Sequence, residues 1–213
     1  MYIDLLNQKT KKKMKKILHI ISTPKEEGSY SVQLGNAVIE KIQNSYPGST
    51  VKEISLVEKQ FPHLQAAHIQ AFFTPAENQT PEQIESLRYS DEAIADIKDA
   101  DILVIGAPVY NFGITSTLKT WIDLIIRAGH SFKHDENGIE GLIKGKKVYI
   151  ALASGLVYTE GPFQSYDLAV PHLKAALGFI GLTDISVFRA EGTSVPELKD
   201  KALEKAINSI VLN

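Results

Sequence analysis

The sequence predicts an α/β fold, with a doubly wound, five-stranded parallel sheet and helices on both of its faces. The first observation is that five short apolar runs of the 213-residue chain alternate with five amphipathic segments, which is the pattern of successive β-α units. The second is that the first run, residues 17–21, is short and continuous, as expected for a strand that is buried on both faces. Together they predict one large domain around a parallel sheet.

The first half of the chain contains the first two strands. Residues 17–21 form the first, and Ser29 or Ser31 can cap the helix that follows it. Residues 51–56 alternate apolar and polar side chains, which places the second strand nearer to an edge of the sheet. The irregular insertion at residues 57–79 is long enough to be a lid or an interface segment.

The middle of the chain contains the third strand, at residues 102–107. A capping signature, Thr80-Pro81-Glu82-Gln83, opens the helix that precedes this strand. The helix that follows it opens at Thr115 or Ser116 and ends at Gly129. Residues 130–146 are predicted to be a loop or a hairpin.

The last third of the chain completes the sheet, with strands at residues 148–152 and 185–188 and a helix at about residues 167–179 between them. Ser194-Val195-Pro196-Glu197 predicts the cap of the last helix. Five strands favour the order 2-1-3-4-5 of flavodoxin-like sheets over a six-stranded dinucleotide fold.

The amino-terminal arm is strongly basic. Residues 1–16 carry six lysines and one aspartate, a charge of +5, so the rest of the chain carries −7 of the net charge of −2. Such an arm can bind nucleic acid or an anionic membrane, but Met14 leads directly into the first apolar run and resembles an alternative start. We therefore expect residues 1–13 to be a disordered extension, residues 14–213 to be a single domain, and neither nucleic acid nor a membrane to be a partner.

Several kinds of chemistry lack the residues that they need. The chain has no cysteine, which excludes disulfides and thiolate sites and suits a cytoplasmic protein. It has no G-x-G-x-x-G fingerprint, no P-loop and no G-x-S-x-G nucleophile elbow. We expect no metal, because the loop histidines lack the ligand company that metals need. A flavin mononucleotide needs neither nucleotide motif.

Two loops at strand ends offer binding groups, and ligands of open α/β sheets bind beyond the carboxyl ends of the strands. Tyr110-Asn111-Phe112 follows the third strand and offers a flat apolar surface and an amide to a hydrogen-bonding ring. The hydroxyls of Thr23, Ser29 and Ser31 precede the first helix, whose amino terminus can bind a phosphate. The alternative is that these serines are only helix caps.

The stretch Ala107-Pro108-Val109-Tyr110-Asn111-Phe112-Gly113-Ile114 resembles the FMN-dependent NADH-azoreductases, also called NADH:quinone oxidoreductases. The match continues through Leu118-Lys119, Trp121-Ile122-Asp123-Leu124, Arg127-Ala128-Gly129, Leu177-Gly178-Phe179-Ile180-Gly181 and Ala190-Glu191-Gly192. It covers the chain from about Met14 to the carboxyl terminus.

The resemblance implies three FMN-binding loops. The first holds the phosphate and ribityl chain through Thr23, Ser29, Tyr30 and Ser31, with Tyr30 in place of the usual glutamine. The second lies beside the flavin ring and consists of Val109, Tyr110, Asn111 and Phe112. The third follows the fourth strand, where this chain has Ala153, Ser154, Gly155 and Leu156 and the family usually has Ser-Arg-Gly-Gly. Phe132 and Phe163 are candidates for the substrate side, with internal packing as the alternative.

The resemblance also implies the activity. NADH, a co-substrate, reduces the bound FMN, and a quinone or azo compound then takes two electrons at the same site in a ping-pong reaction. No catalytic side chain is expected, because the cofactor carries the chemistry. The family is homodimeric, with each flavin near the subunit interface. Two alternatives remain open: a narrower NAD(P)H:quinone reductase without useful azo activity, and a flavodoxin-like FMN electron carrier or binding module that does not use NADH.

Overall fold

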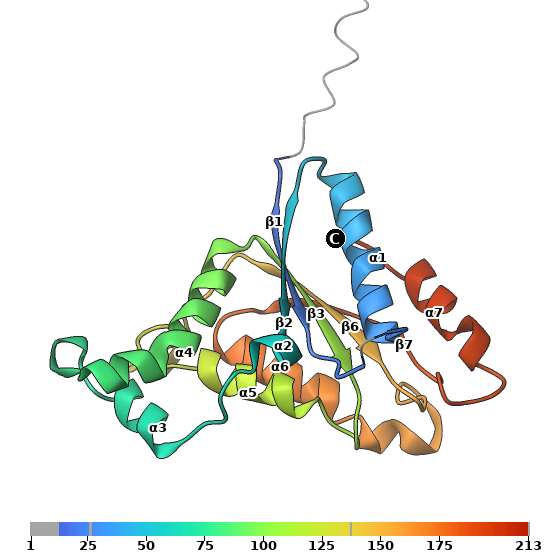
Figure 1. Cartoon of the computed structure of the whole chain (residues 1–213). Helices are drawn as coiled ribbons and strands as arrows, with labels where there is room; N and C mark the ends of the chain where they lie inside the picture. The colour runs from blue at the N-terminus through green and yellow to red at the C-terminus, as the bar shows by residue number, and fades with distance from the viewer. Residues whose placement is uncertain (1–12, 26, 137, 213) are drawn as a thin grey trace, which may run out of the picture.

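A five-stranded parallel sheet forms the centre of the molecule (Figure 1). The structure, a computed structural model, describes residues 13–25, 27–136 and 138–212. The strands of the sheet are β1 (Lys16–Ile21), β2 (Thr50–Ser55), β3 (Ile102–Pro108), β6 (Lys147–Ala153) and β7 (Asp184–Ala190). Their spatial order is β2-β1-β3-β6-β7. Because β4 and β5 form a separate hairpin, this is the predicted order 2-1-3-4-5, and β2 lies at an edge as expected.

Helices cover both faces of the sheet. α1 (Tyr30–Ser45) and α7 (Lys199–Asn208) lie on one face, and α4 (Pro81–Asp99), α5 (Ser116–Ile125) and α6 (Ala169–Phe179) lie on the other (Figure 1). Alternate residues of β1 therefore enter different cores. Ile17 packs in the cluster of α1 and α7, whereas Leu18 and Ile20 pack in the cluster of α4, α5 and α6.

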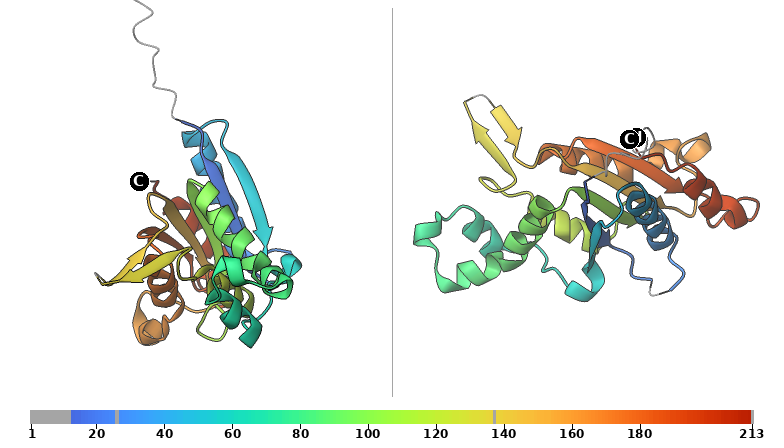
Figure 2. Two further views of the ribbon diagram at one scale, coloured as in Figure 1. Left: turned by 90° about the vertical axis from the view of Figure 1, so that its left-hand side faces the viewer. Right: turned by 90° about the horizontal axis from the view of Figure 1, so that it is seen from above.

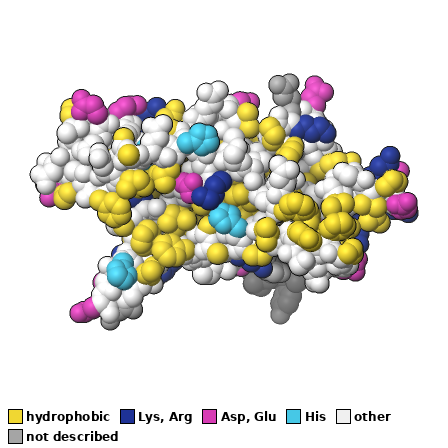
Figure 3. Space-filling model, turned by 90° about the horizontal axis from the view of Figure 1, so that it is seen from below, with side chains coloured by type: hydrophobic (Ala, Val, Ile, Leu, Met, Phe, Trp, Pro, Cys, Tyr) yellow, Lys and Arg dark blue, Asp and Glu magenta, His cyan; other side chains and the backbone are white. Residues whose placement is uncertain are grey.

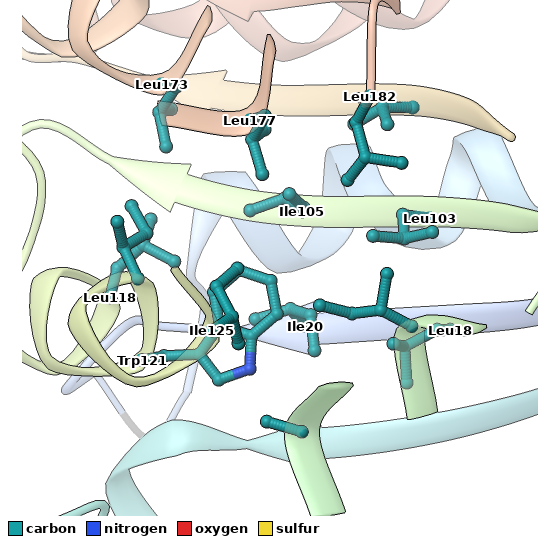
Figure 4. Close-up of a cluster of buried hydrophobic side chains, with 14 of the residues drawn as sticks. Leu18, Ile20, Leu103, Ile105, Leu118, Trp121, Ile125, Leu173, Leu177 and Leu182 are labelled. Carbon is teal, nitrogen blue, oxygen red and sulfur yellow. The ribbon is translucent and has the colours of Figure 1, made fainter. Parts of the chain in front are cut away.

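The core beneath α4, α5 and α6 is the larger of the two. Figure 4 shows Trp121 of α5 pointing at Ile20 of β1, with Leu173 and Leu177 of α6 above Ile105 of β3. The apolar side chains of α5 face this core, since Leu118, Trp121, Ile122 and Ile125 are all buried. The helix ends at Ile125, earlier than predicted, and Gly129 takes a left-handed conformation in the loop that follows.

The segments that connect the strands agree with the sequence predictions to different degrees. Thr80 and Gln83 form the predicted capping box at the start of α4, and the predicted hairpin consists of β4 (Phe132–Asp135) and β5 (Gly138–Gly141). The insertion folds as α2 (Leu56–Lys59), α3 (Ala66–Phe72) and the 3₁₀ turn η1 (Ala76–Asn78). The cap predicted at residues 194–197 is wrong: α7 begins at Lys199 without a side-chain cap, because the amide of Ser194 instead donates to the carbonyl of Gly155.

The predicted amino-terminal extension falls almost entirely outside the described residues. Of the predicted extension, residues 1–12 lie outside the described residues, so residues 1–13 as a disordered arm stay a prediction, as does the domain boundary at Met14. In the part that the structure describes, no helix is both long and apolar enough to cross a membrane, and no group of three His, Asp or Glu side chains is placed to hold a metal ion.

Candidate functional site

The three predicted loops meet at the carboxyl end of the sheet, which is its lower end in Figure 1. The amide of Val109, just past β3, donates to the carbonyl of Ala153 at the end of β6 (2.7 Å). The hydroxyl of Ser22, just past β1, donates to the carbonyl of Gly106 (2.7 Å). The hydroxyl of Thr117, in the first turn of α5, donates to the carbonyl of Ser22 (3.2 Å). These bonds join the first loop, the second loop and the third loop to one another.

The second loop is a tight turn with unusual backbone angles. Tyr110 and Gly113 exchange both of their backbone hydrogen bonds, each 3.0 Å long. Asn111 and Phe112 lie between them with φ of 48° and 69°, which is the geometry of a type I′ turn. Asn tolerates a positive φ, but an aromatic residue there is strained by roughly 1–3 kcal/mol. Strain of this kind accumulates at binding sites, and the amides of Asn111 and Phe112 take no part in the turn's own two bonds.

An aromatic segment stands over this turn. We call the 3₁₀ segment η2 (Gly161–Tyr166) the aromatic cover. Its Tyr166 ring lies 5.3 Å from the ring of Phe112 and 6.3 Å from the ring of Phe163, measured between centroids. Phe112, Phe163 and Tyr166 all remain partly open to solvent. The predicted residue Phe163 is therefore joined to the second loop through Tyr166.

A groove of about 740 Å³ runs along the turn and the start of α5. Such a volume suits a cofactor or a small ligand. Apolar side chains spread in a broad band across this face of the molecule, which is the one seen from below in Figure 3. Of the predicted residues only Tyr110 and Asn111 line the groove; the other lining residues are Pro24, Gly113, Ile114, Thr115, Ser116, Lys119, Leu168 and His172.

Sequence reasoning missed most of that lining. Leu168 and His172 lie one helical turn apart at the start of α6, and the sequence could have shown them as the first turn of a helix that begins at the carboxyl end of the sheet. Lys119 is paired with Asp123 one turn further along α5, with a distance of 2.5 Å between nitrogen and oxygen. Lys119 is therefore a cationic side chain in the groove lining whose charge is balanced by Asp123.

The hydroxyl of Ser29 in the first loop does not cap α1, although it stands at the amino terminus of that helix. Ser29 occupies the N-cap position, but its side chain bonds no amide of the helix. Its hydroxyl instead lies 3.1 Å from the hydroxyl of Ser31. Both side chains are buried, as is Thr23, and Tyr30 is partly buried. The expectation that Ser29 marks the helix start is confirmed, whereas the alternative that its hydroxyl serves only as a cap is wrong.

A buried histidine lies beneath α1. His19 of β1 is fully buried, and its Nδ1 lies 3.0 Å from the carboxylate of the exposed Glu53. Burial lowers the pKa of His19, and the contact with Glu53 opposes part of that effect. A Cβ on Gly35 of α1 would lie 2.7 Å from the ring nitrogen Nε2. Gly35 thus lets α1 approach the sheet closely, and this sets the position of its amino terminus.

The third loop is held by a hydrogen bond within the loop and by contacts with Ala190 and Ser194. The hydroxyl of Ser154 donates to the carbonyl of Leu156 (2.8 Å), and the amide of Ser154 donates to Ala190. Gly155 faces Ser194, whose hydroxyl would lie 2.7 Å from a Cβ at this position. Ala153, Ser154, Gly155 and Leu156 do not line the groove, so their part in FMN binding stays a prediction.

Phe132 does not join this groove within one chain. It starts β4, and its ring packs edge-on against Phe179 at the end of α6, 4.7 Å between centroids. The base of the hairpin is tied to the same end of α6, since the amide of Ile143 donates to the carbonyl of Ile180. That end lies beside the amino end of the sheet. The substrate role of Phe132 stays a prediction.

Comparisons with known proteins agree with this geometry. The family model for the flavodoxin-like fold matches residues 15–212. Relatives named FMN-dependent NADH:quinone oxidoreductase, from Herminiimonas arsenicoxydans and Paraburkholderia phymatum, are 44% and 46% identical over 198 residues. These alignments cover 92% of this chain and 97% and 98% of the relatives.

Solved structures give the same result. A crystal structure of azoreductase from Bacillus anthracis str. Sterne superposes with a TM-score of 0.85 at 29% identity, covering 92% of this chain and 96% of that one. An FMN-dependent NADH-azoreductase from Bacillus anthracis str. Ames Ancestor, in complex with FMN, gives 0.80 at 29% identity, with 92% and 97% covered. The fold is thus that of the flavodoxin-like class. Within it, the chain belongs to the family of the FMN-dependent NADH:quinone oxidoreductases.

Proposed function

We infer that this protein is an FMN-dependent oxidoreductase that takes two electrons from NADH and passes them to quinones and azo compounds. The observation that carries the inference is its membership of the family along almost the whole chain, at 44% identity to a relative of that name. The groove beside the strained turn supports the inference, because its volume suits a cofactor or a small ligand.

The residues present fit a flavin mononucleotide. At one end, the amino terminus of α1 carries no acidic residue in its first turn, and the buried hydroxyls of Ser29 and Ser31 lie beside it. Helix amides and neutral hydroxyls are suitable donors for a phosphate. At the other end, the turn offers the amides of Asn111 and Phe112 and the Tyr110 side chain. A phosphate site and a wall for a flat ring therefore lie along one edge of the sheet.

The role of the protein is to bind and orient. When bound, FMN supplies the electron-transfer chemistry, so the chain needs no nucleophile. We propose that Thr23, Ser29, Tyr30 and Ser31 hold the phosphate and ribityl end, that residues 109–112 hold the ring, and that residues 153–156 border it. The amides of Asn111 and Phe112 would donate to the ring of a bound FMN and would favour negative charge on it. Phe163, in the aromatic cover, excludes water from the groove.

We further propose that the protein works in the cytoplasm as a homodimer, without nucleic acid or a membrane as partner. The absence of cysteine suits a reducing compartment. The β4–β5 hairpin projects from the body (Figure 2), and Ile139 on it is 57% exposed. A two-stranded hairpin is marginally stable alone, so a second copy is a fitting neighbour. In that arrangement Phe132 would contribute to the site of the other subunit. Light scattering of the purified protein tests the dimer.

The activity is tested with purified, FMN-loaded protein. We expect a yellow protein whose flavin absorbance is bleached by NADH without oxygen and restored by a quinone or an azo dye. A colourless protein that ignores added FMN would refute the inference. Bleaching by a partner reductase but not by NADH would instead identify an electron carrier. Rates with NADPH and with a panel of quinones and azo dyes then define the range of substrates.

A further inference from the structure

The aromatic cover is an exposed segment whose two ends are fastened at one point. All six of its residues are exposed, and it starts at Gly161, which has a φ of +77°. Within the described residues, its ring contacts are those of Tyr166 with Phe112 and Phe163. Such a segment needs anchors at its ends to keep one position over the groove.

The amino end of the cover is held by the carboxylate of Glu191, just past β7. The amide of Tyr158 donates to Oε1 of Glu191 (2.9 Å), and the hydroxyl of Thr159 donates to Oε2 (2.6 Å). Both carboxylate oxygens are thereby used to hold residues 158 and 159. These residues connect the third loop to the cover.

The carboxyl end of the cover is held by Asp167, through Arg189 on β7. Nη2 of Arg189 lies 2.5 Å from Oδ2 of Asp167, and Nη1 lies 3.2 Å from Oε1 of Glu191. The three side chains are largely buried, with exposed fractions of 17%, 18% and 10% for Arg189, Asp167 and Glu191. One guanidinium therefore bridges the carboxylates at both ends of the cover, with a separate nitrogen for each of them.

We propose that Arg189 is a positioning residue that holds the aromatic cover over the groove and thereby determines how well large flat acceptors bind. The proposal rests on the proposed function. Leu168, the residue after Asp167, lines the groove, so a shift at Asp167 moves the groove wall as well as the cover. We expect a one-ring quinone to fit in the groove beside Asn111 without reaching the cover, and an acceptor with three fused rings to extend toward it.

Three variants and a control separate this role from ordinary stability. Arg189→Met removes the bridge and leaves two carboxylates facing each other, so the ends of the cover separate. Asp167→Asn is milder, because an asparagine oxygen can still accept from the amide of Val170 at the start of α6, a bond of 3.3 Å in the structure. Arg189→Lys keeps the charge and restores one of the two contacts. Lys201→Met is the matched control, since Lys201 lines the adjoining pocket but pairs with no acidic side chain among the described residues.

The first measurement is hydrogen exchange of the FMN-loaded protein, followed by mass spectrometry. We expect faster exchange in peptides that cover residues 157–168 for Arg189→Met, a smaller effect for Asp167→Asn and for Arg189→Lys, and none for Lys201→Met. Unchanged exchange of this segment in Arg189→Met would overturn the proposal. This measurement needs neither NADH nor an acceptor.

The second measurement is the steady-state rate with a one-ring and a three-ring quinone. For Arg189→Met we expect KM for the three-ring quinone to rise about fivefold, as a loss of roughly 1 kcal/mol gives, while kcat and KM for the one-ring quinone stay unchanged. Equal changes with both quinones would show a merely structural role and overturn the proposal. If NADH does not bleach the wild-type flavin, the proposed function fails, and the exchange result still decides whether Arg189 anchors the cover.

Discussion

Replacing Ser29 by alanine gives the sharpest test of the phosphate end of the site. Ser29 stands at the N-cap of α1, where an alanine replacement ordinarily destabilises a helix by about 1 kcal/mol. Its hydroxyl, however, bonds no helix amide and lies 3.1 Å from Ser31. The side chain is buried, beside a helix terminus that favours an anion. We therefore expect the loss to fall on FMN binding rather than on folding.

The magnitude follows from the kind of hydrogen bond that is removed. A bond from a hydroxyl to a charged group contributes roughly 1.5–3 kcal/mol, which corresponds to a rise in the Kd for FMN of about tenfold to about 150-fold. The free energy of unfolding of the apoprotein should fall by no more than about 1 kcal/mol, the contribution of one hydroxyl–hydroxyl bond. Thr80→Ala is the matched control, because the hydroxyl of Thr80 does accept from the amide of Gln83 at the start of α4 (3.3 Å).

The assay is a titration of apoprotein with FMN, followed by the quenching of flavin fluorescence, with urea unfolding of the apoprotein in parallel. Ser29→Ala should lose affinity and keep most of its stability. Thr80→Ala should lose about 1 kcal/mol of stability and keep its affinity for FMN. An unchanged Kd in Ser29→Ala, or an equal loss of affinity in both variants, would refute the assignment of Ser29 to the phosphate.

Three further outcomes are expected. Phe112→Gly should leave the melting temperature nearly unchanged, because relief of roughly 1 kcal/mol of backbone strain offsets the lost contact with Tyr166. The KM for a three-ring quinone should rise. A large fall in melting temperature would mean that the Phe112 ring is ordinary packing. Gly35→Ala places a Cβ 2.7 Å from the ring of His19, so the free energy of unfolding in urea should fall by about 1–3 kcal/mol. Titration should show a weaker affinity for FMN. Native values for both quantities would contradict the close approach of α1. Because burial lowers the pKa of His19 below its ordinary value of 6.5, the unfolded chain binds a proton there that the folded chain does not, so stability should be complete above pH 6.5 and fall as the pH drops below it. Urea midpoints should fall less steeply with decreasing pH in His19→Leu than in the wild type, and parallel curves would contradict this.

The strands and the sheet order could be predicted because their signals are local and repeated. Five apolar runs became five strands, and the hydroxyl and amide of Thr80 and Gln83 formed the capping box that their spacing predicts. The cap predicted at Ser194 was wrong because a non-local contact decides the conformation there. The neighbours of Ser194 show the same kind of capping spacing, but its amide bonds Gly155 across the third loop. A contact between residues that are distant in the sequence thus outweighed the local signal.

The loops at the strand ends could be located from the sequence, but their geometry could not. The end of the third strand placed residues 109–112 at the carboxyl end of the sheet, where the structure has them. Nothing in Asn111-Phe112 predicts positive φ at both positions, because type I′ turns ordinarily carry glycine in the second of them. The bond from Arg189 to Asp167, 22 residues apart, is likewise invisible to spacing. It depends on β7 lying beside β6, so that the end of β7 faces the segment that leaves the third loop.

The strained turn and the aromatic cover are connected by a series of contacts. The turn is held below by the bond from Val109 to Ala153 and above by the ring of Tyr166 on Phe112. Strain at a functional site persists only where the surroundings determine the conformation. Tyr166 is itself exposed, and the residue after it, Asp167, is held by Arg189. Loss of Arg189 should therefore weaken the upper support of the turn while the lower support remains. It follows that the ring wall and the binding of large acceptors depend on β7, whereas the phosphate end depends on α1 and its close approach to β1.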